Sequence, residues 1–126
     1  MNATLKLGEH FIFDLSDCKH EILMNSERAY SLFAQAVHES GLTVVDEGFY
    51  KFSPHGFTCF LLLAESHANL QAGPDYDYCT IDLFTCAIGK DMMPLIQRIK
   101  EAFGADSFAL RKIDREAEVE KIPFAL

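Results

Sequence analysis

The sequence predicts an α+β fold, a two-layer sandwich in which two helices cover one face of a mainly antiparallel sheet. Apolar, β-rich segments and two amphipathic helical stripes follow one another in the order strand, helix, three strands, helix, strand. The length of 126 residues, with 49% hydrophobic and 24% charged residues, suits one packed core. We therefore expect a single domain over residues 1–126, without an internal repeat or linker.

The first part of the chain is predicted to form a strand and a long helix. Residues 10–15 are apolar and β-rich, so the first strand is expected there, and a short helical turn is expected at residues 21–24. Either Asn25 or Ser26 can cap the helix that follows. Apolar residues then recur at helical spacing until Gly41, where a glycine suits the end of the helix. This helix is expected to pack its apolar face on a sheet.

Two strands and a polar segment come next. The second strand is expected at residues 42–45 and again at 49–52, and a turn with Pro and Gly at residues 53–56 leads into the apolar run 57–64. These two strands are expected to pair antiparallel. Residues 65–75 are polar and contain Gly and Pro, so they are predicted to form a loop between two buried strands. Such loops often hold reactive groups, and the site is expected here.

The last part of the chain repeats the strand and helix pattern. A strand is expected at residues 78–86, and a helix capped by Asp91 is expected to run to Gly104. A final strand is predicted at residues 107–113, where apolar and polar residues alternate. The tail, residues 116–126, has mixed charge and is expected to be loose or to pack on a partner subunit.

The charge balance excludes some classes of partner. The formal net charge of -8 argues against nucleic acid, because phosphate binding depends on clustered Lys and Arg. An acidic protein instead suits a cationic small molecule. No apolar run approaches the roughly eighteen residues that a membrane span requires, and no targeting segment precedes the first strand. We therefore expect a cytoplasmic protein without membrane contact.

The cysteines and histidines do not predict a metal site. The four cysteines show neither a C-x-x-C pair nor zinc spacing, so each is expected to be a small buried hydrophobe with a reduced thiol. They are Cys18, Cys59, Cys79 and Cys86. His10, His20 and His38 are too dispersed to indicate a metal centre.

A sheet with helices on one side leaves its other face to be covered or wetted. Phe60 and three leucines, residues 60–63, follow one another without a polar residue, which is too apolar for a wetted face. The sequence therefore predicts a homodimer, for which apposed sheets are one arrangement.

Several motifs occur together in one order over nearly the whole chain, from about Leu5 to Arg115. They are Leu7-Gly8-Glu9-His10, Gly41-Leu42-Thr43-Val44-Val45, Tyr50-Lys51-Phe52-Ser53-Pro54-His55-Gly56, Leu63-Ala64-Glu65-Ser66-His67, Pro74, and Ile81-Asp82-Leu83-Phe84-Thr85-Cys86. With these motifs the chain resembles the short prokaryotic form of S-adenosylmethionine decarboxylase, a self-processing proenzyme.

The resemblance implies that the chain makes its own cofactor. Ser66 would attack the carbonyl of Glu65 to form an ester, and elimination followed by hydrolysis would leave a pyruvoyl group at the start of the chain of residues 66–126. Residues 1–65 would be the second chain. The pyruvoyl ketone would bind the substrate amine as a Schiff base and accept the electrons left by carbon dioxide. The implied activity is that of a lyase in polyamine (spermidine) biosynthesis, without a metal.

The resemblance also implies roles for other residues. Cys86 falls where the family has its proton donor. Thr58 takes the place of a serine that assists processing, and Phe52 matches an aromatic that stacks on adenine. Glu9 lies on the first strand and is expected to approach the pocket as a further substrate-binding residue.

Four positions depart from the family pattern. The family has His, Thr, a bulky residue and Glu where this chain has Gln71, Ala72, Gly73 and Asp75. The family histidine assists processing, and glutamine cannot carry a proton near neutral pH. His67 or His55 would then be the candidates to replace it. Asp75 keeps the carboxylate that binds the ribose but shortens its reach.

Three functions are compatible with these departures. The first is an S-adenosylmethionine decarboxylase with a compensated site. The second is a pyruvoyl-dependent decarboxylase whose pocket has been rebuilt for arginine or ornithine, which an acidic pocket without a bulky wall at Gly73 would suit. The third is an unprocessed, non-catalytic homologue or regulatory partner.

Overall fold

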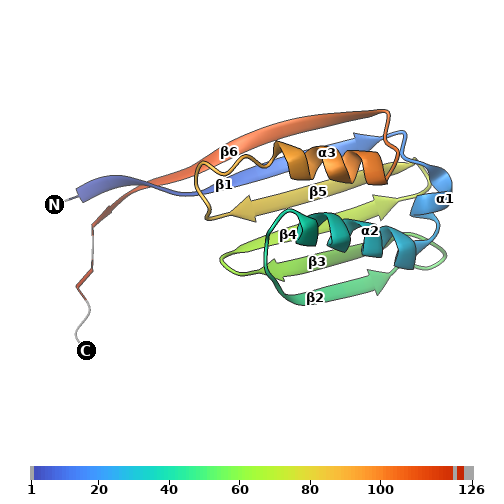
Figure 1. Cartoon of the computed structure of the whole chain (residues 1–126), viewed down its shortest axis with the longest axis horizontal. Coiled ribbons are helices and arrows are strands. Elements are labelled where there is room, and N and C mark those ends of the chain that lie inside the picture. Colours follow the sequence, from blue (N-terminus) through green and yellow to red (C-terminus); the bar gives the residue numbers. More distant parts are fainter. Residues whose placement is uncertain (1, 121, 124–126) are drawn as a thin grey trace.

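The protein is described here by a computed structural model that covers residues 2–120 and 122–123. Six strands form one sheet in the order β2-β3-β4-β5-β1-β6, and every neighbouring pair is antiparallel (Figure 1). The strands are β1 (Asn2–Ser16), β2 (Val44–Lys51), β3 (Phe57–Leu63), β4 (Ser66–Gly73), β5 (Tyr78–Thr85) and β6 (Ser107–Glu120). The predicted α+β class is confirmed.

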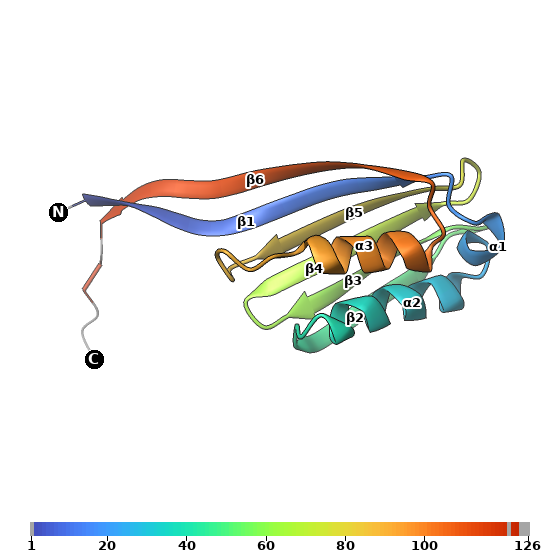
Figure 2. The ribbon, with the colours of Figure 1, turned by 45° about the horizontal axis from the view of Figure 1, so that its top comes forward.

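The helices lie together on one face of the sheet (Figure 2). They are α1 (His20–Leu23), α2 (Ser26–Glu39) and α3 (Met93–Ala102). The side chain of Asn25 accepts the N–H of Arg28 at 3.2 Å, so it caps α2 as predicted. Gly41 and Gly104, where both long helices were expected to end, have positive φ of 81° and 60°. Among the described residues, none of these helices is long and apolar enough to cross a membrane.

The core lies between the helices and the sheet. Along β3 the buried residues alternate with more exposed ones, because successive side chains point to opposite faces. Phe57, Cys59, Leu61 and Leu63 face the helices and are at most 3% exposed. Phe60 and Leu62 point to the other face, where they are 46% and 45% exposed. The apolar run at residues 60–63 is therefore divided between a filled core and an uncovered face, which we call the open face.

The predicted loop at residues 65–75 is wrong, because residues 66–73 form β4 in the middle of the sheet. The small or apolar Ala68, Leu70 and Ala72 point into the core, and the polar residues between them point to the open face. This period of two is typical of a half-buried strand. The residue types are poor strand formers, so the polar composition concealed the pattern.

The first and last strands are longer than the sequence predicts. β1 begins at Asn2, and β6 continues through residues 116–120, which were expected to be tail. Residues 2–6 pair only with β6, so the two strands form a ribbon that extends beyond the rest of the sheet (Figures 1 and 2). A bulge at Leu7 shifts the register between them. Residues 121 and 124–126 of the expected tail lie outside the described residues.

A pair of substitutions on β4 tests its place in the sheet. Leu70→Ala should lower the free energy of unfolding by about 2–5 kcal/mol, because it leaves a cavity in the core. Gln71→Ala, one residue further on the open face, should change it by less than about 0.5 kcal/mol. Urea unfolding measures both values. Similar small effects for the two variants would contradict a strand at this position.

Candidate functional site

The turn between β3 and β4 contains only two residues, Ala64 and Glu65. Leu63 pairs directly with Ser66, and the N–H of Ala64 donates to the carbonyl of Thr43 at 3.0 Å. Glu65 has a φ of +65°, in the left-handed region that favours glycine. A non-glycine residue held there costs roughly 1–3 kcal/mol of strain. The Glu65–Ser66 bond, where cleavage is predicted, therefore follows a strained residue in an exposed turn.

Ser66 and Cys86 occupy neighbouring positions at one end of the sheet. Ser66 is the first residue of β4 and pairs with Thr85 on β5, and Cys86 follows Thr85 directly. Paired strands are separated by about 4.8 Å. Cys86 is also exposed, whereas the other three cysteines are buried. The register thus brings the backbone of the predicted pyruvoyl precursor beside the residue that directly precedes the predicted proton donor.

Burial and mutual contact shift the pKa values of the three buried cysteines. Burial raises the pKa of Cys59 to about 12. A hydrogen bond between the thiols of Cys18 and Cys79 raises the pKa of Cys79 and lowers that of Cys18. These three side chains pack in the core, as the sequence predicts for small hydrophobes.

A cluster of aromatic rings lies on the open face, at the end of the sheet where β4 begins with Ser66. The ring of His67 stacks on Phe84 with centroids 5.5 Å apart, and His10 meets the same ring edge-on at 5.9 Å. The guanidinium of Arg115 lies 5.8 Å from the Phe84 centroid. Phe84 also covers Gly8, where an added Cβ would lie 2.5 Å from the ring. Nε2 of His10 is buried and has no hydrogen-bond partner in the described part of the chain.

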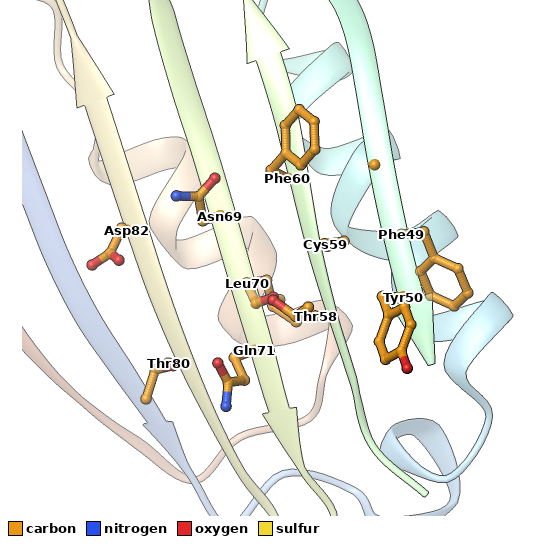
Figure 3. Close-up of a pocket in the computed structure, with 11 residues that line it drawn as sticks. Phe49, Tyr50, Thr58, Cys59, Phe60, Asn69, Leu70, Gln71, Thr80 and Asp82 are labelled. Atoms are coloured by element: carbon orange, nitrogen blue, oxygen red, sulfur yellow. The ribbon is translucent and has the colours of Figure 1, made fainter. Parts of the chain in front are cut away.

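A groove of about 630 Å³ crosses the open face over β2, β3, β4 and β5 (Figure 3). This volume lies within the range of small-molecule sites. The lining residues are Gly48, Phe49, Tyr50, Thr58, Cys59, Phe60, Asn69, Leu70, Gln71, Thr80 and Asp82. Aromatic rings stand at the β2 and β3 side, and polar groups from β4 and β5 stand opposite them (Figure 3).

Thr58 and Gln71, the two predicted processing positions in the groove, are direct cross-strand partners. The hydroxyl of Thr58 donates to the carbonyl of Leu70 at 3.3 Å. Gln71 lies five positions along β4 from Ser66. At about 3.4 Å per residue this separation is roughly 17 Å. One chain therefore does not bring Gln71 and Thr58 to its own Ser66.

Phe52 and Asp75, the predicted substrate-binding residues, lie at the same end of the sheet as Gln71. Phe52 follows β2, and its ring centroid is 5.8 Å from that of Tyr50 in the groove. Asp75 follows β4, and its carboxylate pairs with the imidazole of His55. An aromatic ring and a carboxylate therefore stand near the groove end, but far along β4 from Ser66.

Glu9 lies on the helix-covered face, not in the groove. It pairs with Thr85 across β1 and β5 and is only 1% exposed. Oε2 accepts from Lys112 at 2.6 Å and Lys6 at 2.8 Å, and Oε1 accepts from the N–H of Gly89 at 3.2 Å. The ammonium groups of Lys112 and Lys6 lower the pKa of Glu9 to about 2.

Several groove and cluster residues were not predicted from the sequence. They are His10, Tyr50, Phe60, Asn69, Thr80, Asp82, Phe84 and Arg115. The alternation along β4 and β5 was the signal that could have found Asn69, Thr80, Asp82 and Phe84, because alternate residues share a face. No group of three or more His, Cys, Asp or Glu side chains suited to a metal ion occurs within residues 2–120 and 122–123.

Comparisons with known proteins agree on one family. A family model described as S-adenosylmethionine decarboxylase matches residues 9–116. The S-adenosylmethionine decarboxylase proenzyme of Thermotoga maritima is 34% identical over 99 residues, which cover 79% of this chain and 76% of that protein. The proenzyme of Thermococcus gammatolerans is 29% identical over 118 residues, covering 94% and 82%. The crystal structure of the adenosylmethionine decarboxylase from Aquifex aeolicus VF5 matches with a TM-score of 0.81, 25% identity and coverage of 95% and 98%.

Replacement of Glu9 should change how stability depends on acid. The pKa of Glu9 falls from 4.5 to about 2 on folding, so its ionised carboxylate stabilises the fold fully at pH values above 4.5. This stabilisation is lost as the pH falls from 4.5 towards about 2. The difference in free energy of unfolding between wild type and Glu9→Gln should therefore shrink from about pH 6 to about pH 2. Urea unfolding over this range measures it, and a constant difference would contradict the ion pairing.

Proposed function

The chain belongs to the S-adenosylmethionine decarboxylase family, and from this premise we propose that it is a self-processing, pyruvoyl-dependent decarboxylase of S-adenosylmethionine. The observation that carries the proposal is the left-handed Glu65 immediately before Ser66, in a turn beside Cys86. Decarboxylated S-adenosylmethionine would then serve polyamine synthesis. The proposed location is the cytoplasm, where the four cysteines would stay reduced.

The β3–β4 turn suits formation of the pyruvoyl group. Attack by the Ser66 hydroxyl on the Glu65 carbonyl replaces the peptide bond by an ester and releases the backbone strain at Glu65. Pairing of Ser66 with both Leu63 and Thr85 fixes the backbone on the other side of the bond. Once formed, the pyruvoyl group supplies a sink for the electrons left by carbon dioxide.

Cys86 is the proposed proton donor. A general acid must lie within hydrogen-bond reach of the atom that it protonates, and Cys86 directly follows the cross-strand partner of Ser66. The remaining cysteines are buried in the core and face away from solvent. The exposed position of Cys86 therefore supports this role.

The groove is the proposed site for the adenosyl part of the substrate. Phe52, next to Tyr50, would stack on the adenine, and Asp75 would bind the ribose hydroxyls with His55 holding its carboxylate. The carboxylate of Asp82 in the groove would favour a cationic substrate such as a sulfonium. These groups bind and orient the substrate and leave the chemistry to the other end of the sheet.

We further propose that the active unit is a homodimer with the two open faces apposed. Within one chain, the groove end of β4 lies roughly 17 Å from Ser66. A second copy turned end to end would place its own Thr58, Gln71 and Phe52 against the end of the sheet that carries Ser66 and Cys86 of the first. The exposed Phe60 and Leu62 on the open face support such a contact.

Cleavage and decarboxylation test the proposed function. Purified protein should separate under denaturing conditions into fragments of residues 1–65 and 66–126, the latter with pyruvate at its end by mass spectrometry. Ser66→Ala should remain one chain. The cleaved protein should release carbon dioxide from S-adenosylmethionine.

The same assay distinguishes the alternatives. Carbon dioxide from arginine or ornithine, and not from S-adenosylmethionine, would replace the proposed substrate. One intact wild-type chain after long incubation would refute both enzyme functions and favour a non-catalytic homologue.

Mixing two inactive variants tests the shared site. Ser66→Ala cannot cleave but carries an intact Thr58 and Gln71, and Thr58→Ala/Gln71→Ala keeps Ser66. Unfolded together and refolded, they should form mixed dimers in which the second chain is cleaved, although neither variant cleaves alone. Mass spectrometry identifies the cut chain. If the refolded mixture shows no more cleavage than each variant alone, a site built from two copies is contradicted.

A further inference from the structure

The segment that carries Cys86 is an exposed loop, residues 86–91, between β5 and α3. All six residues are exposed, including the side chain of Ile88 at 46%. Apolar packing therefore does little to hold the loop. Its backbone turns on itself through bonds from Ile88 N–H to the Cys86 carbonyl and from Lys90 N–H to the Ala87 carbonyl, at 3.0 and 3.2 Å. These bonds fix the shape of the loop but not its position on the sheet.

Two side chains from the sheet hold the backbone of this loop. The hydroxyl oxygen of Thr85 accepts the N–H of Ala87 at 3.0 Å, directly after Cys86. Oε1 of Glu9 accepts the N–H of Gly89 at 3.2 Å, in the middle of the loop. Glu9 and Thr85 are themselves cross-strand partners on the helix-covered face and are almost fully buried. The loop is thus tied to two adjacent, rigid positions in the sheet.

The surroundings of Glu9 explain how a carboxylate can serve as a buried anchor. A buried charge is tolerated when it is paired and hydrogen-bonded. Lys6 and Lys112 both bind Oε2, which leaves Oε1 for Gly89. Asp114 also lies 3.1 Å from Lys6 and helps to hold that lysine in place. The carboxylate therefore presents one oxygen to the loop in a fixed direction.

The backbone of Gly89 is shaped for this contact. Its φ of +81° is a left-handed conformation that side chains other than glycine adopt only with strain. An added Cβ would meet no atom within 4 Å, so steric crowding does not require the glycine. The glycine instead allows the turn that aims its N–H at Glu9.

We propose that Glu9 is a positioning residue, which sets the place of Cys86 relative to Ser66 by holding the loop through Gly89. The inference rests on the proposed function, because it assigns Glu9 to the proton donor of that reaction. It gives Glu9 a role that needs no contact with the substrate, since Lys6, Lys112 and Gly89 already occupy its two oxygens.

Steady-state kinetics and amide exchange on the processed protein test this role. Glu9→Ala should lower kcat about 10- to 100-fold, as expected for a misplaced catalytic group, with little change in KM. Glu9→Gln leaves one side-chain oxygen, for which Gly89 and the two ammonium groups compete, so it should lower kcat less than Glu9→Ala does. Hydrogen exchange by NMR should show Gly89 protected in wild type, partly protected in Glu9→Gln and unprotected in Glu9→Ala. Self-cleavage, which uses the β3–β4 turn, should continue in all three.

Two further variants make the comparison specific. Glu27→Ala removes a carboxylate that also binds a lysine at 2.8 Å, but on α2 and far from the loop, and should leave kcat unchanged. Thr85→Val removes the other tie without touching the ion pairs and should lower kcat in the same way as Glu9→Ala. If Glu9→Ala does not fold, which a lack of cleavage would reveal, the loss of kcat and of Gly89 protection in Glu9→Gln carries the test of Glu9.

Specific results would overturn the inference. One is loss of Gly89 protection in Glu9→Ala with an unchanged kcat, since the loop would then not need this anchor. Another is a Gly89 amide that stays protected in Glu9→Ala, because the loop would then be held by groups other than this carboxylate. A wild-type protein that neither cleaves nor decarboxylates would refute the proposed function instead. In that case an unprotected Gly89 amide in wild type would still disprove the anchor.

Discussion

The register of β4 between its two neighbours is the constraint on which the site depends. Ser66 pairs with Leu63 on one side and with Thr85 on the other, so its backbone is fixed from both directions. Because only two residues remain to reverse the chain, Glu65 takes a left-handed conformation. A shift of one residue would move every side chain of β4 to the other face and remove both the strained turn and the pairing beside Cys86.

The alternation of side chains then separates stability from binding. Ala68, Leu70 and Ala72 fill the core under the helices, and the residues between them line the groove. The polar groups of the open face therefore do not have to be buried in the core. Glu9 is an exception, since it is a charged residue on the core face, and its two lysines and the Gly89 N–H offset the cost of burying it.

The sequence predicted the fold class, both long helices and the strongly apolar strands, because in those segments burial and propensity agree. The roles assigned to Ser66 and Cys86 come from motifs that are local in sequence, and they stay predictions. The sequence missed β4, where Ala, Asn and Gln form a strand only because β3 and β5 pair with it on both sides. The face on which Glu9 lies could not be predicted either, because the bulge at Leu7 and the true length of β1 depend on pairing with β6.

The position of Gln71 on β4 bears on how a glutamine could serve where the resemblance implies a histidine. Roughly 17 Å of extended strand separate it from Ser66 of the same chain, so a residue there can assist cleavage only across a dimer. Strain of roughly 1–3 kcal/mol at Glu65, if fully released in the transition state, accelerates ester formation by about one to two powers of ten. A general acid or base contributes about 10²–10⁴-fold. The strained turn thus offsets only part of a lost histidine, which is compatible with cleavage that is slow rather than absent.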